Sequence, residues 1–341
     1  MNATTDSRLP WFGENRFPLY LAPMAGFTDL PYRHLCKRFG AEVMVSEFVM
    51  CEALLREVPG VWETIEFTDY QRPMGVQIFG SEPRRMGEAA RLIEDRLQPD
   101  FLDLNFGCPS EKVTRAEAGC SLLKNLPRLA AIAAAVREAL PPERPLTAKI
   151  RIGWDAESLV AGEAARLLEE AGVEALAIHG RTRVQGYKGD ADMGVIEEVA
   201  AERTIPVIAN GSVQDWERIR WLAGESSCRG AMIGRAALGN PWIFRRLRHF
   251  LDTGEILPAP ALSERIDALL FYARELRHSP LGQQRGESLG WMRPKLKSLL
   301  KDLPHSRRAR AALDQAASFG ELDRLLRAWA AGATAAAADA A

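Results

Sequence analysis

A cysteine directly after a predicted buried strand is the feature of the sequence most suggestive of chemistry. The apolar run Phe101–Phe106 predicts the strand, and Cys108 follows Gly107 in a loop that must be sharply folded. Catalytic groups of α/β barrels are carried just past the ends of strands. A single cysteine is more often structural than reactive, so a catalytic role for Cys108 depends on what surrounds it.

The rest of the chain predicts a barrel that would position such a residue. Eight short apolar runs cover residues 19–24, 42–48, 74–80, 101–106, 146–152, 175–180, 206–211 and 231–234. Helical patterns lie between them, for example at 83–96, 126–140, 159–171 and 214–223. The runs are rich in Val, Ile and Leu, which is typical of parallel strands buried on both faces. This alternation over about 250 residues predicts a (β/α)8 TIM barrel. A doubly wound sheet would more naturally carry a G-x-G-x-x-G motif after its first strand, where this chain has Ala-Pro-Met-Ala-Gly-Phe.

The barrel fold gathers the carboxyl ends of its strands at one rim, where chemistry takes place. The predicted strand ends carry polar or conformationally special residues, namely Pro23, Met24, Ser46, Glu47, Gln77, Asn105, Cys108, Lys149, Arg151, His179, Arg181, Asn210, Gly211, Ser212, Gly234 and Arg235. Buried apolar strands have little reason to end in such residues unless something polar binds there. Together they predict a binding site at this rim.

The ends of the last two predicted strands form the usual phosphate site of this fold. Gly211 and Gly234 allow backbone N–H groups to approach an anion, and Arg235 adds a guanidinium. We therefore expect a phosphate-bearing cofactor. Lys149, in the predicted barrel mouth, could stabilise negative charge on a bound ring, as in a reduced flavin, or form a Schiff base. The residues alone leave both roles open.

A basic helical segment follows the barrel. Pro and Gly near residues 252–262 predict a boundary between a barrel at 1–252 and a helical bundle at 258–331, with a frayed tail at 332–341. Leucine stripes predict its helices, and Ser318 and Glu321 form a capping box before the last of them. The segment 258–331 has 13 Lys and Arg against 8 Asp and Glu, although the whole chain has a formal charge of −1. Such a segment favours a polyanionic partner.

Composition narrows the class of protein further. The five cysteines are odd in number and form no CxxC pair, which predicts reduced thiols without a disulfide framework or a zinc site. The N-terminus lacks the pattern of a secretory signal, and no apolar run approaches the ~20 residues that cross a bilayer. We expect a cytoplasmic protein that binds no metal, inserts in no membrane and needs no obligate protein partner.

Seven motifs in the same order resemble the tRNA-dihydrouridine synthase family, most closely its bacterial B-type branch. They are Leu21-Ala-Pro-Met-Ala-Gly-Phe-Thr-Asp, Asp103-Leu-Asn-Phe-Gly-Cys-Pro-Ser-Glu-Lys-Val, Ala118-Gly-Cys-Ser-Leu-Leu, Lys149-Ile-Arg, Ile178-His-Gly-Arg-Thr-Arg, Ile208-Ala-Asn-Gly and Met232-Ile-Gly-Arg-Ala-Ala-Leu-Gly-Asn-Pro-Trp-Ile-Phe. The resemblance runs from about residue 19 to residue 250, and the helical segment after it fits in size and position.

The resemblance implies an FMN-bearing barrel that reduces particular uridines of tRNA to 5,6-dihydrouridine, with NADPH or NADH as the reductant. Cys108 would give a proton to uracil C5 while the flavin N5 hydride goes to C6. The implied flavin-binding residues are Pro23, Met24 and Ala25 through the backbone, Gln77 and Lys149 at the ring edge, and His179, Asn210, Gly211, Ser212, Gly234 and Arg235 toward the phosphate. We assign substrate binding to Asn105, Arg151 and Arg181 at the rim and to Arg293, Lys295 and Lys297 in the helical segment.

Two positions depart from the family pattern, and two other functions compete. Ser212 stands where the branch often has Asp, and Pro294 interrupts a run that is often Met-Arg-Lys-His-like. One competing function is an FMN barrel acting on a free pyrimidine, like a dihydroorotate dehydrogenase, but a small substrate has no need of a basic bundle. The other is a non-catalytic RNA-binding or flavin-sensing barrel, which would not need Cys108 and Lys149 at its strand ends. The sequence leaves open which uridine is reduced.

Overall fold

The structure is a computed structural model that describes residues 8–13, 16–286, 288–300 and 306–338, with side chains described as far as residue 331. The chain separates into two compact units. The first unit contains Met1–Asp29 and Ala41–Gly234, and the second contains Leu30–Gly40 and Arg235–Ala341. The limits expected from the sequence, a barrel at 1–252 and a bundle at 258–331, stay a prediction.

Parallel strands close into a barrel in the first unit, which confirms the predicted TIM-barrel class. The strands are β1 (Leu19–Leu21), β2 (Val43–Val45), β3 (Val49–Met50), β4 (Met74–Phe79), β5 (Phe101–Phe106), β6 (Leu146–Arg151), β7 (Ala175–His179), β8 (Val207–Asn210) and β9 (Gly230–Ile233). Each strand from β4 to β9 pairs with the next, β9 pairs with β1, and β2 joins β1 to β4. Instead of one strand at 42–48, the chain forms β2 and β3, which pair with successive parts of β4.

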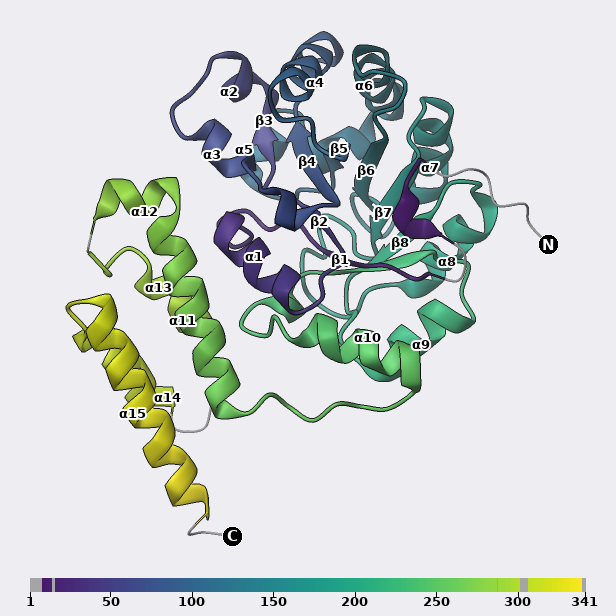
Figure 1. Ribbon diagram of the computed structural model, residues 1–341. Coiled ribbons are helices and arrows are strands. Elements are labelled where there is room, and N and C mark those ends of the chain that lie inside the picture. The colour runs from purple at the N-terminus through teal and green to yellow at the C-terminus, as the bar shows by residue number, and fades with distance from the viewer. Residues whose placement is uncertain (1–7, 14–15, 287, 301–305, 339–341) are drawn as a thin grey trace. The chain divides into compact units, whose positions relative to one another are not determined.

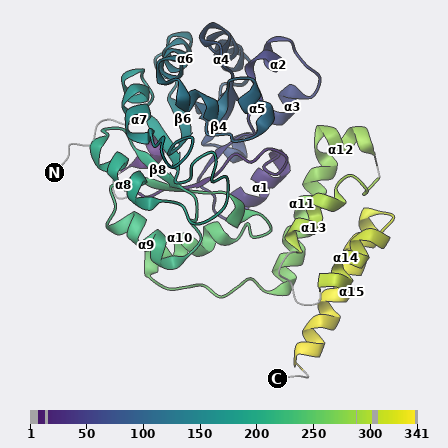
Figure 2. The ribbon, with the colours of Figure 1, turned by 180° about the vertical axis from the view of Figure 1, so that it is seen from behind.

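Helices surround this barrel, as Figures 1 and 2 show from opposite sides. The outer helices include α4 (Pro83–Leu97), α6 (Leu126–Ala139), α7 (Ala161–Glu170), α8 (Met193–Glu202) and α9 (Trp216–Gly224). Shorter helical segments of this unit are η1 (Pro10–Phe12), α2 (Cys51–Leu55), α3 (Val61–Ile65), η2 (Asp69–Gln71), α5 (Glu111–Arg115) and η3 (Gly119–Lys124). The four helices predicted at 83–96, 126–140, 159–171 and 214–223 correspond to α4, α6, α7 and α9.

Aromatic side chains fill the inside of the barrel. Trp11 and Phe12 of η1 belong to the same buried cluster as Tyr20 of β1 and Phe101 of β5, and the Trp11 and Phe101 rings are 5.3 Å apart. Phe101 fits because Gly75 of β4 has no side chain: a Cβ atom there would lie 2.2 Å from the Phe101 ring. The interior opposite the strand ends is therefore solid core, which leaves the rim at those ends for function.

Replacing Gly75 by alanine should destabilise the barrel. The added methyl group overlaps the Phe101 ring, and overpacking of this kind costs about 1–3 kcal/mol of unfolding free energy. Gly162→Ala in α7 is the matched control, because a Cβ atom there meets nothing within 4 Å and alanine favours a helix. Urea unfolding of both variants measures the difference, and equal midpoints would show that Phe101 moves aside without cost.

The second unit is helical, as the sequence predicts for the C-terminal part of the chain. It contains α1 (Leu30–Arg38), η4 (Arg235–Ala237), α10 (Ile243–Thr253), α11 (Leu262–His278), α12 (Pro280–Arg285), α13 (Arg293–Leu299), α14 (Ser306–Gln315) and α15 (Phe319–Ala338). His34 Nδ1 of α1 lies 2.5 Å from Glu275 Oε2 of α11. At the start of α15, Ser318 Oγ accepts from the Glu321 N–H, as the capping box predicts, whereas the Glu321 carboxylate accepts from the N–H of Ala317, one residue before the expected Ser318. The last helix runs to Ala338, into the segment expected to be a tail.

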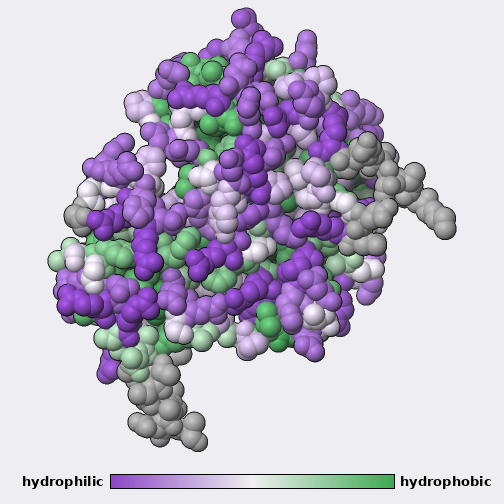
Figure 3. Space-filling view, viewed as in Figure 1, coloured by the Kyte–Doolittle hydropathy of each residue, from purple (hydrophilic) through white to green (hydrophobic). Residues whose placement is uncertain are grey.

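The surface seen in Figure 3 is mostly hydrophilic, with apolar residues in patches between polar ones. None of the helices within the described ranges has the length and apolar character that a membrane crossing requires.

Candidate active site

The loop that carries Cys108 is fixed by hydrogen bonds at both of its ends. Asn105 Oδ1, at the end of β5, accepts from the N–H groups of Gly107 (3.0 Å) and Cys108 (2.9 Å). The Cys108 carbonyl accepts from the Cys120 N–H, and the Cys120 thiol donates to the Gly107 carbonyl. The Cys108 side chain is only 9% exposed, and its sulfur lies 3.6 Å from Ser110 Oγ. The thiol is therefore held in one place rather than on a mobile loop.

A buried polar chain lies beneath this loop. Asn105 Nδ2 donates to Gln77 Oε1 (2.8 Å), and Gln77 Nε2 donates to Asp103 Oδ2 (2.5 Å). The other oxygen of Asp103 accepts from the hydroxyl of Thr147. Strand register explains the order, since Gln77, Asp103 and Thr147 are direct neighbours on β4, β5 and β6, and all three side chains are buried. Sequence reasoning missed Asp103 and Thr147 because it examined only the ends of the strands.

Lys149 of β6 lies next to this chain in the barrel mouth. Burial and, next, the positive charge of Arg151 lower the pKa of Lys149 to about 8, while the charge of Asp103 opposes the change. Burial also raises the pKa of Asp103 to about 6, against the hydrogen bonds from Thr147 and Gln77 and the charge of Lys149. Within the described part of the chain, no carboxylate forms an ion pair with Lys149. The lysine is thus a desolvated cation that faces a possible ligand.

The buried Asp103 carboxyl should make stability depend on pH. Its pKa is raised from 3.8 to about 6 in the folded protein, so the folded state holds this proton more tightly than the unfolded state. Stability from this group is present below pH 3.8 and is lost as pH rises through about 6, a loss of about 3 kcal/mol. Asp103→Asn lacks this titrating group and does not show the loss. The unfolding free energy of Asp103→Asn minus that of wild type should therefore increase by about 3 kcal/mol between about pH 4 and pH 7. Urea titrations measure the difference, and a difference independent of pH would show that burial does not raise the pKa of Asp103.

The opposite side of the rim carries a cluster of His179, Arg181 and Ser212. Arg181 donates to His179 Nε2 (3.1 Å), to Ser212 Oγ (2.8 Å) and to the Gly189 carbonyl (2.8 Å). Because arginine can only donate, His179 Nε2 must be an unprotonated acceptor. Asn210 Nδ2 donates to the Met232 carbonyl, which ties β8 to β9. The predicted rim residues of β7, β8 and β9 are therefore brought together.

Backbone N–H groups at the ends of β8 and β9 suit a phosphate. Among the residues that the structure describes, no protein acceptor is found for the N–H groups of Gly211, Ser212 and Gly234. Gly211 has φ +102°, and a Cβ atom there would lie 2.7 Å from His179 Cδ2, so only glycine fits. Ser212 also has a positive φ, of 51°. These free donors and the desolvated Lys149 fit a cofactor that has both a phosphate and an electron-accepting ring.

The first strand end is partly engaged within the protein. The Met24 N–H donates to Thr28 Oγ1 (2.9 Å), while Pro23 is half-buried and Ala25 is exposed. The Gly26 N–H donates to Glu47 Oε2 (2.8 Å), which links this turn to the segment after β2. The backbone contacts to a flavin that we assigned to Pro23, Met24 and Ala25 stay a prediction.

Two arginines assigned to substrate binding are deeply buried. Arg151 donates from Nε to the Gly107 carbonyl (3.0 Å) and from NH1 to the carbonyls of Thr182 (3.0 Å) and Gly186 (2.8 Å). The guanidinium thus joins the Cys108 loop to the loop after β7. Arg181 is similarly surrounded, as described above. A direct substrate contact of either arginine stays a prediction.

The remaining predicted residues lie in the second unit. Arg235 is exposed at the start of η4. Arg293 donates to the Ala316 carbonyl (2.9 Å), and Lys297 forms an ion pair with Asp314 (2.8 Å), so both take part in joining α13 to the α14 region. Lys295 is half-buried on α13. A role for these residues in substrate binding stays a prediction.

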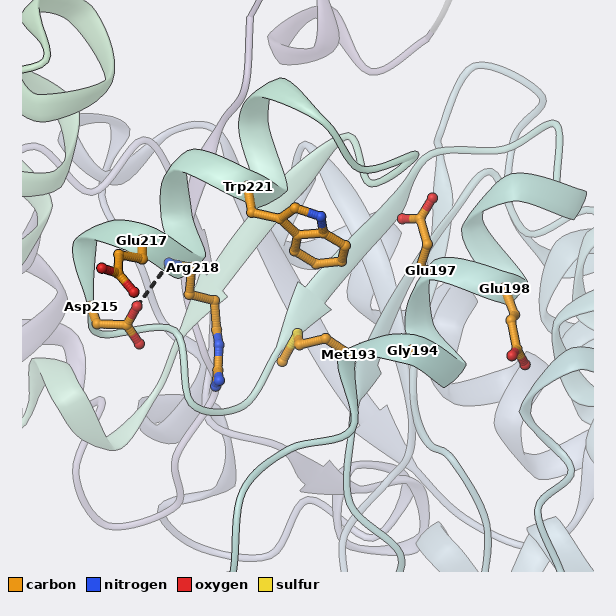
Figure 4. Close-up of a pocket in the computed structure, with 8 residues that line it drawn as sticks. All are labelled: Met193, Gly194, Glu197, Glu198, Asp215, Glu217, Arg218 and Trp221. Carbon is orange, nitrogen blue, oxygen red and sulfur yellow. Dashed lines mark hydrogen bonds between the residues drawn. The ribbon is translucent and has the colours of Figure 1, made fainter.

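A surface groove lies between α8 and α9, beside the loop after β8, where Arg218 donates to the Ser212 carbonyl (3.1 Å). Figure 4 shows its lining, in which four of the eight residues are acidic and one is basic: Met193, Gly194, Glu197, Glu198, Asp215, Glu217, Arg218 and Trp221. Asp215 accepts from the Arg218 N–H and caps α9, so it has a structural role. An acidic groove on the outside of the barrel suits neither a phosphate nor a nucleic acid. Over the described residues, no group of three or more His, Cys, Asp or Glu is arranged to hold a metal ion.

Comparisons with known proteins place the chain in a family. A model described as dihydrouridine synthase matches residues 20–335. The tRNA-dihydrouridine synthase B of Xanthomonas axonopodis pv. citri (strain 306) is 39% identical over 307 residues, or 87% of each chain. That of Escherichia coli (strain K12) is 41% identical over 275 residues, which cover 79% of this chain and 82% of that protein. A solved structure of a 2-naphthoyl-CoA reductase with 2-naphthoyl-CoA has a TM-score of 0.52 at 12% identity, covering 68% of this chain and 50% of that one, and shows likeness of fold alone.

The family match covers nearly the whole chain and confirms the resemblance carried by the seven sequence motifs. The chain belongs to the dihydrouridine synthase family, whose members reduce uridine with a flavin.

Proposed function

We propose that this protein binds FMN and uses NADPH to reduce specific uridines of tRNA to 5,6-dihydrouridine, with Cys108 as the proton donor. The observation that carries the proposal is the single rim that holds Cys108 on its fixed loop, Lys149 in the barrel mouth and the free N–H groups of Gly211 and Gly234. A tRNA substrate is also named for relatives that are about 40% identical over most of the chain.

The residues that would hold the flavin divide into two groups. Lys149 would contact the ring, because it lies half-buried on β6 next to Asn105 of the neighbouring strand. Gln77 is expected from the sequence at the same ring edge, but its side chain is fully buried and bonded to Asp103 and Asn105, so it would lie behind the ring-binding surface. The N–H groups of Gly211, Ser212 and Gly234 would hold the phosphate, with Arg235, His179 and Asn210 as further candidates. When bound, FMN supplies the hydride that adds to C6 of uracil.

Cys108 would complete the reduction. Hydride addition at C6 leaves negative charge at C5, which must take a proton from a nearby acid. The S–H bond of Cys108 breaks, the C5–H bond forms, and the thiolate regains a proton from water. Ser110 Oγ, 3.6 Å from the sulfur, can donate a hydrogen bond to the thiolate in the interval. The restrained loop keeps the sulfur in place without a mobile segment having to close.

Basic and aromatic side chains at the same rim support a nucleic-acid substrate. Lys124 lies 3.5 Å from the centre of the Trp154 ring, and the Arg183 guanidinium lies 4.9 Å from it. Tyr187, after β7, is 54% exposed. Cations bind phosphates and exposed aromatic rings stack on unpaired bases, which is how proteins recognise single-stranded parts of RNA.

Reversing the charge of Lys124 or Arg183 should weaken tRNA binding. Each change to glutamate removes one phosphate contact and should raise the KM for tRNA roughly tenfold and reduce the salt slope of binding by about one. Arg91→Glu, on the exposed face of α4, makes the same change in charge away from the rim and should leave the KM unchanged. Binding titrations at several salt concentrations measure both quantities. Equal effects of the three variants would mean that tRNA binding depends on the net charge of the protein and not on where these residues lie.

The experiment that tests the function compares substrates on one enzyme. Wild-type protein is loaded with FMN and reduced with NADPH, and its flavin absorbance is followed after addition of an unmodified tRNA transcript, free uridine or orotate. We expect reoxidation by the transcript and little by the small molecules. Reoxidation by orotate but not by tRNA would favour a free-pyrimidine enzyme, and no reoxidation by any would favour a non-catalytic barrel. A cytoplasmic location is part of the same proposal, because tRNA is there.

A further inference from the structure

Asp103 is a buried acid that the proposed reaction does not use. It lies within β5, two residues before Asn105, and is 3% exposed. Burying a carboxyl costs free energy unless it is hydrogen-bonded. Both of its oxygens accept hydrogen bonds, one from Gln77 and one from Thr147. Core packing alone therefore does not explain why a carboxyl occupies this position.

The direction of each hydrogen bond gives that reason. A carboxylate can only accept, so Gln77 must turn its NH2 group toward Asp103 and its oxygen toward Asn105. That oxygen accepts from Asn105 Nδ2, so Asn105 Oδ1 points the other way. There it accepts from the N–H groups of Gly107 and Cys108. The Asp103 carboxylate thus determines which end of the Gln77 amide and which end of the Asn105 amide face each partner, as far as the Cys108 backbone.

We propose that Asp103 is a positioning residue that holds the Cys108 loop in its reactive geometry through Gln77 and Asn105. The inference rests on the proposed function, because a fixed proton donor is what the loop geometry serves. It adds a residue that touches neither Cys108 nor a substrate. The carboxylate sets the orientation of two amides that could otherwise flip, since their oxygen and nitrogen ends have nearly the same shape.

Single substitutions at the two ends should each loosen the loop. Asp103→Asn weakens the acceptor for Gln77 and allows that amide to flip. Asn105→Asp keeps an oxygen for the Gly107 and Cys108 N–H groups but sets a second oxygen against Gln77 Oε1. Losing a hydrogen bond to a charged group corresponds to about a tenfold change in an opening equilibrium. We expect iodoacetamide to alkylate Cys108 about tenfold faster in each variant than in wild type.

The double variant Asp103→Asn with Asn105→Asp should reverse these effects. The amide at 103 can then donate to Gln77 Oε1, Gln77 can turn its NH2 group toward the carboxylate at 105, and that carboxylate still accepts from the loop N–H groups. Every donor and acceptor of this chain then has a hydrogen-bond partner, with the direction of the bonds at Gln77 reversed. Restored protection of Cys108 in the double variant is a rescue that loss of packing alone cannot produce.

The test measures alkylation of Cys108 by peptide mass analysis in FMN-loaded protein, with buried Cys120 as an internal reference. Thr147→Val is the matched control, because it removes the other hydrogen bond of Asp103 without touching Gln77, and its Cys108 rate should stay within about twofold of wild type. Restored protection of Cys108 in the double variant supports the proposal that Asp103 positions the loop through Gln77 and Asn105. A double variant whose Cys108 is alkylated as fast as in the single variants overturns it. If Asp103→Asn does not fold, the Cys108 alkylation rates of Asn105→Asp and Thr147→Val are compared instead. A faster rate in Asn105→Asp alone supports the proposal, and equal rates overturn it.

Activity gives a second readout that separates this inference from the proposed function. With tRNA, Asp103→Asn should lower kcat about tenfold and leave the KM unchanged, because the loop geometry and not the binding surface has changed. A wild type that reduces no tRNA would refute the proposed function, yet the alkylation result would still decide whether Asp103 positions the loop.

Discussion

Cys108→Ala should reduce dihydrouridine formation in tRNA by a factor of about 10²–10⁴, the usual contribution of a positioned acid. The reason is local, since the variant loses the proton donor while the hydrogen bonds to the loop backbone remain. Flavin content and the rate of flavin reduction by NADPH should be unchanged, because neither requires the thiol. Single-turnover mixing of reduced, FMN-loaded protein with an unmodified tRNA transcript measures the step directly.

Cys228→Ala is the matched control for this prediction. Cys228 is also a buried thiol, but it precedes β9 on the side away from the strand ends, and burial raises its pKa to about 11. Its loss should cost some stability and leave the rate of tRNA reduction within about twofold of wild type. Equal single-turnover rates for wild type and Cys108→Ala would show that another group, or water, donates the proton.

Lys149→Met should lower kcat by about 10²-fold, as expected when a cation that stabilises developing charge is removed from a desolvated site. The effect should depend on pH. Burial lowers the pKa of Lys149 to about 8, so the wild type keeps its ammonium at neutral pH and loses it as pH rises through about 8. The ratio of wild-type to variant rates should therefore fall above that pH, because both proteins then lack the charge.

Lys188→Met is the control for Lys149→Met, since it removes a lysine that is exposed to solvent after β7. At saturating tRNA its kcat should match that of wild type across the pH range. Stopped-flow measurements between about pH 6 and pH 10 cover the transition of Lys149. A wild-type to Lys149→Met ratio that does not change with pH would mean that Lys149 acts by its shape and not by its charge.

The sequence predicts the barrel well because its signals are local. The strand at 101–106 has the limits observed for β5, since an apolar run there ends at a glycine. The strand expected at 42–48 is wrong in detail, because the chain leaves the sheet between β2 and β3. There Ser46 accepts from the Gln77 N–H through its hydroxyl, in place of a regular ladder bond. That interruption depends on β4, which is distant in the sequence.

The candidate site could be predicted as a set of strand ends but not as a network. Cys108, Lys149 and Gly211 come to one rim because parallel strands share a direction. The buried bonds of Arg151 to Gly107 and Gly186 could not be expected, because loops far apart in the chain provide the carbonyls. Asp103 had a detectable signal, since an acid within an apolar strand must find partners.

The most direct test of the central claim is nucleoside analysis of an unmodified tRNA transcript after incubation with FMN-loaded wild-type protein and NADPH. We expect dihydrouridine at specific positions, none without NADPH, and little with Cys108→Ala. A transcript that contains no dihydrouridine after incubation with flavin-loaded wild type and NADPH would contradict the claim that this protein reduces uridine in tRNA.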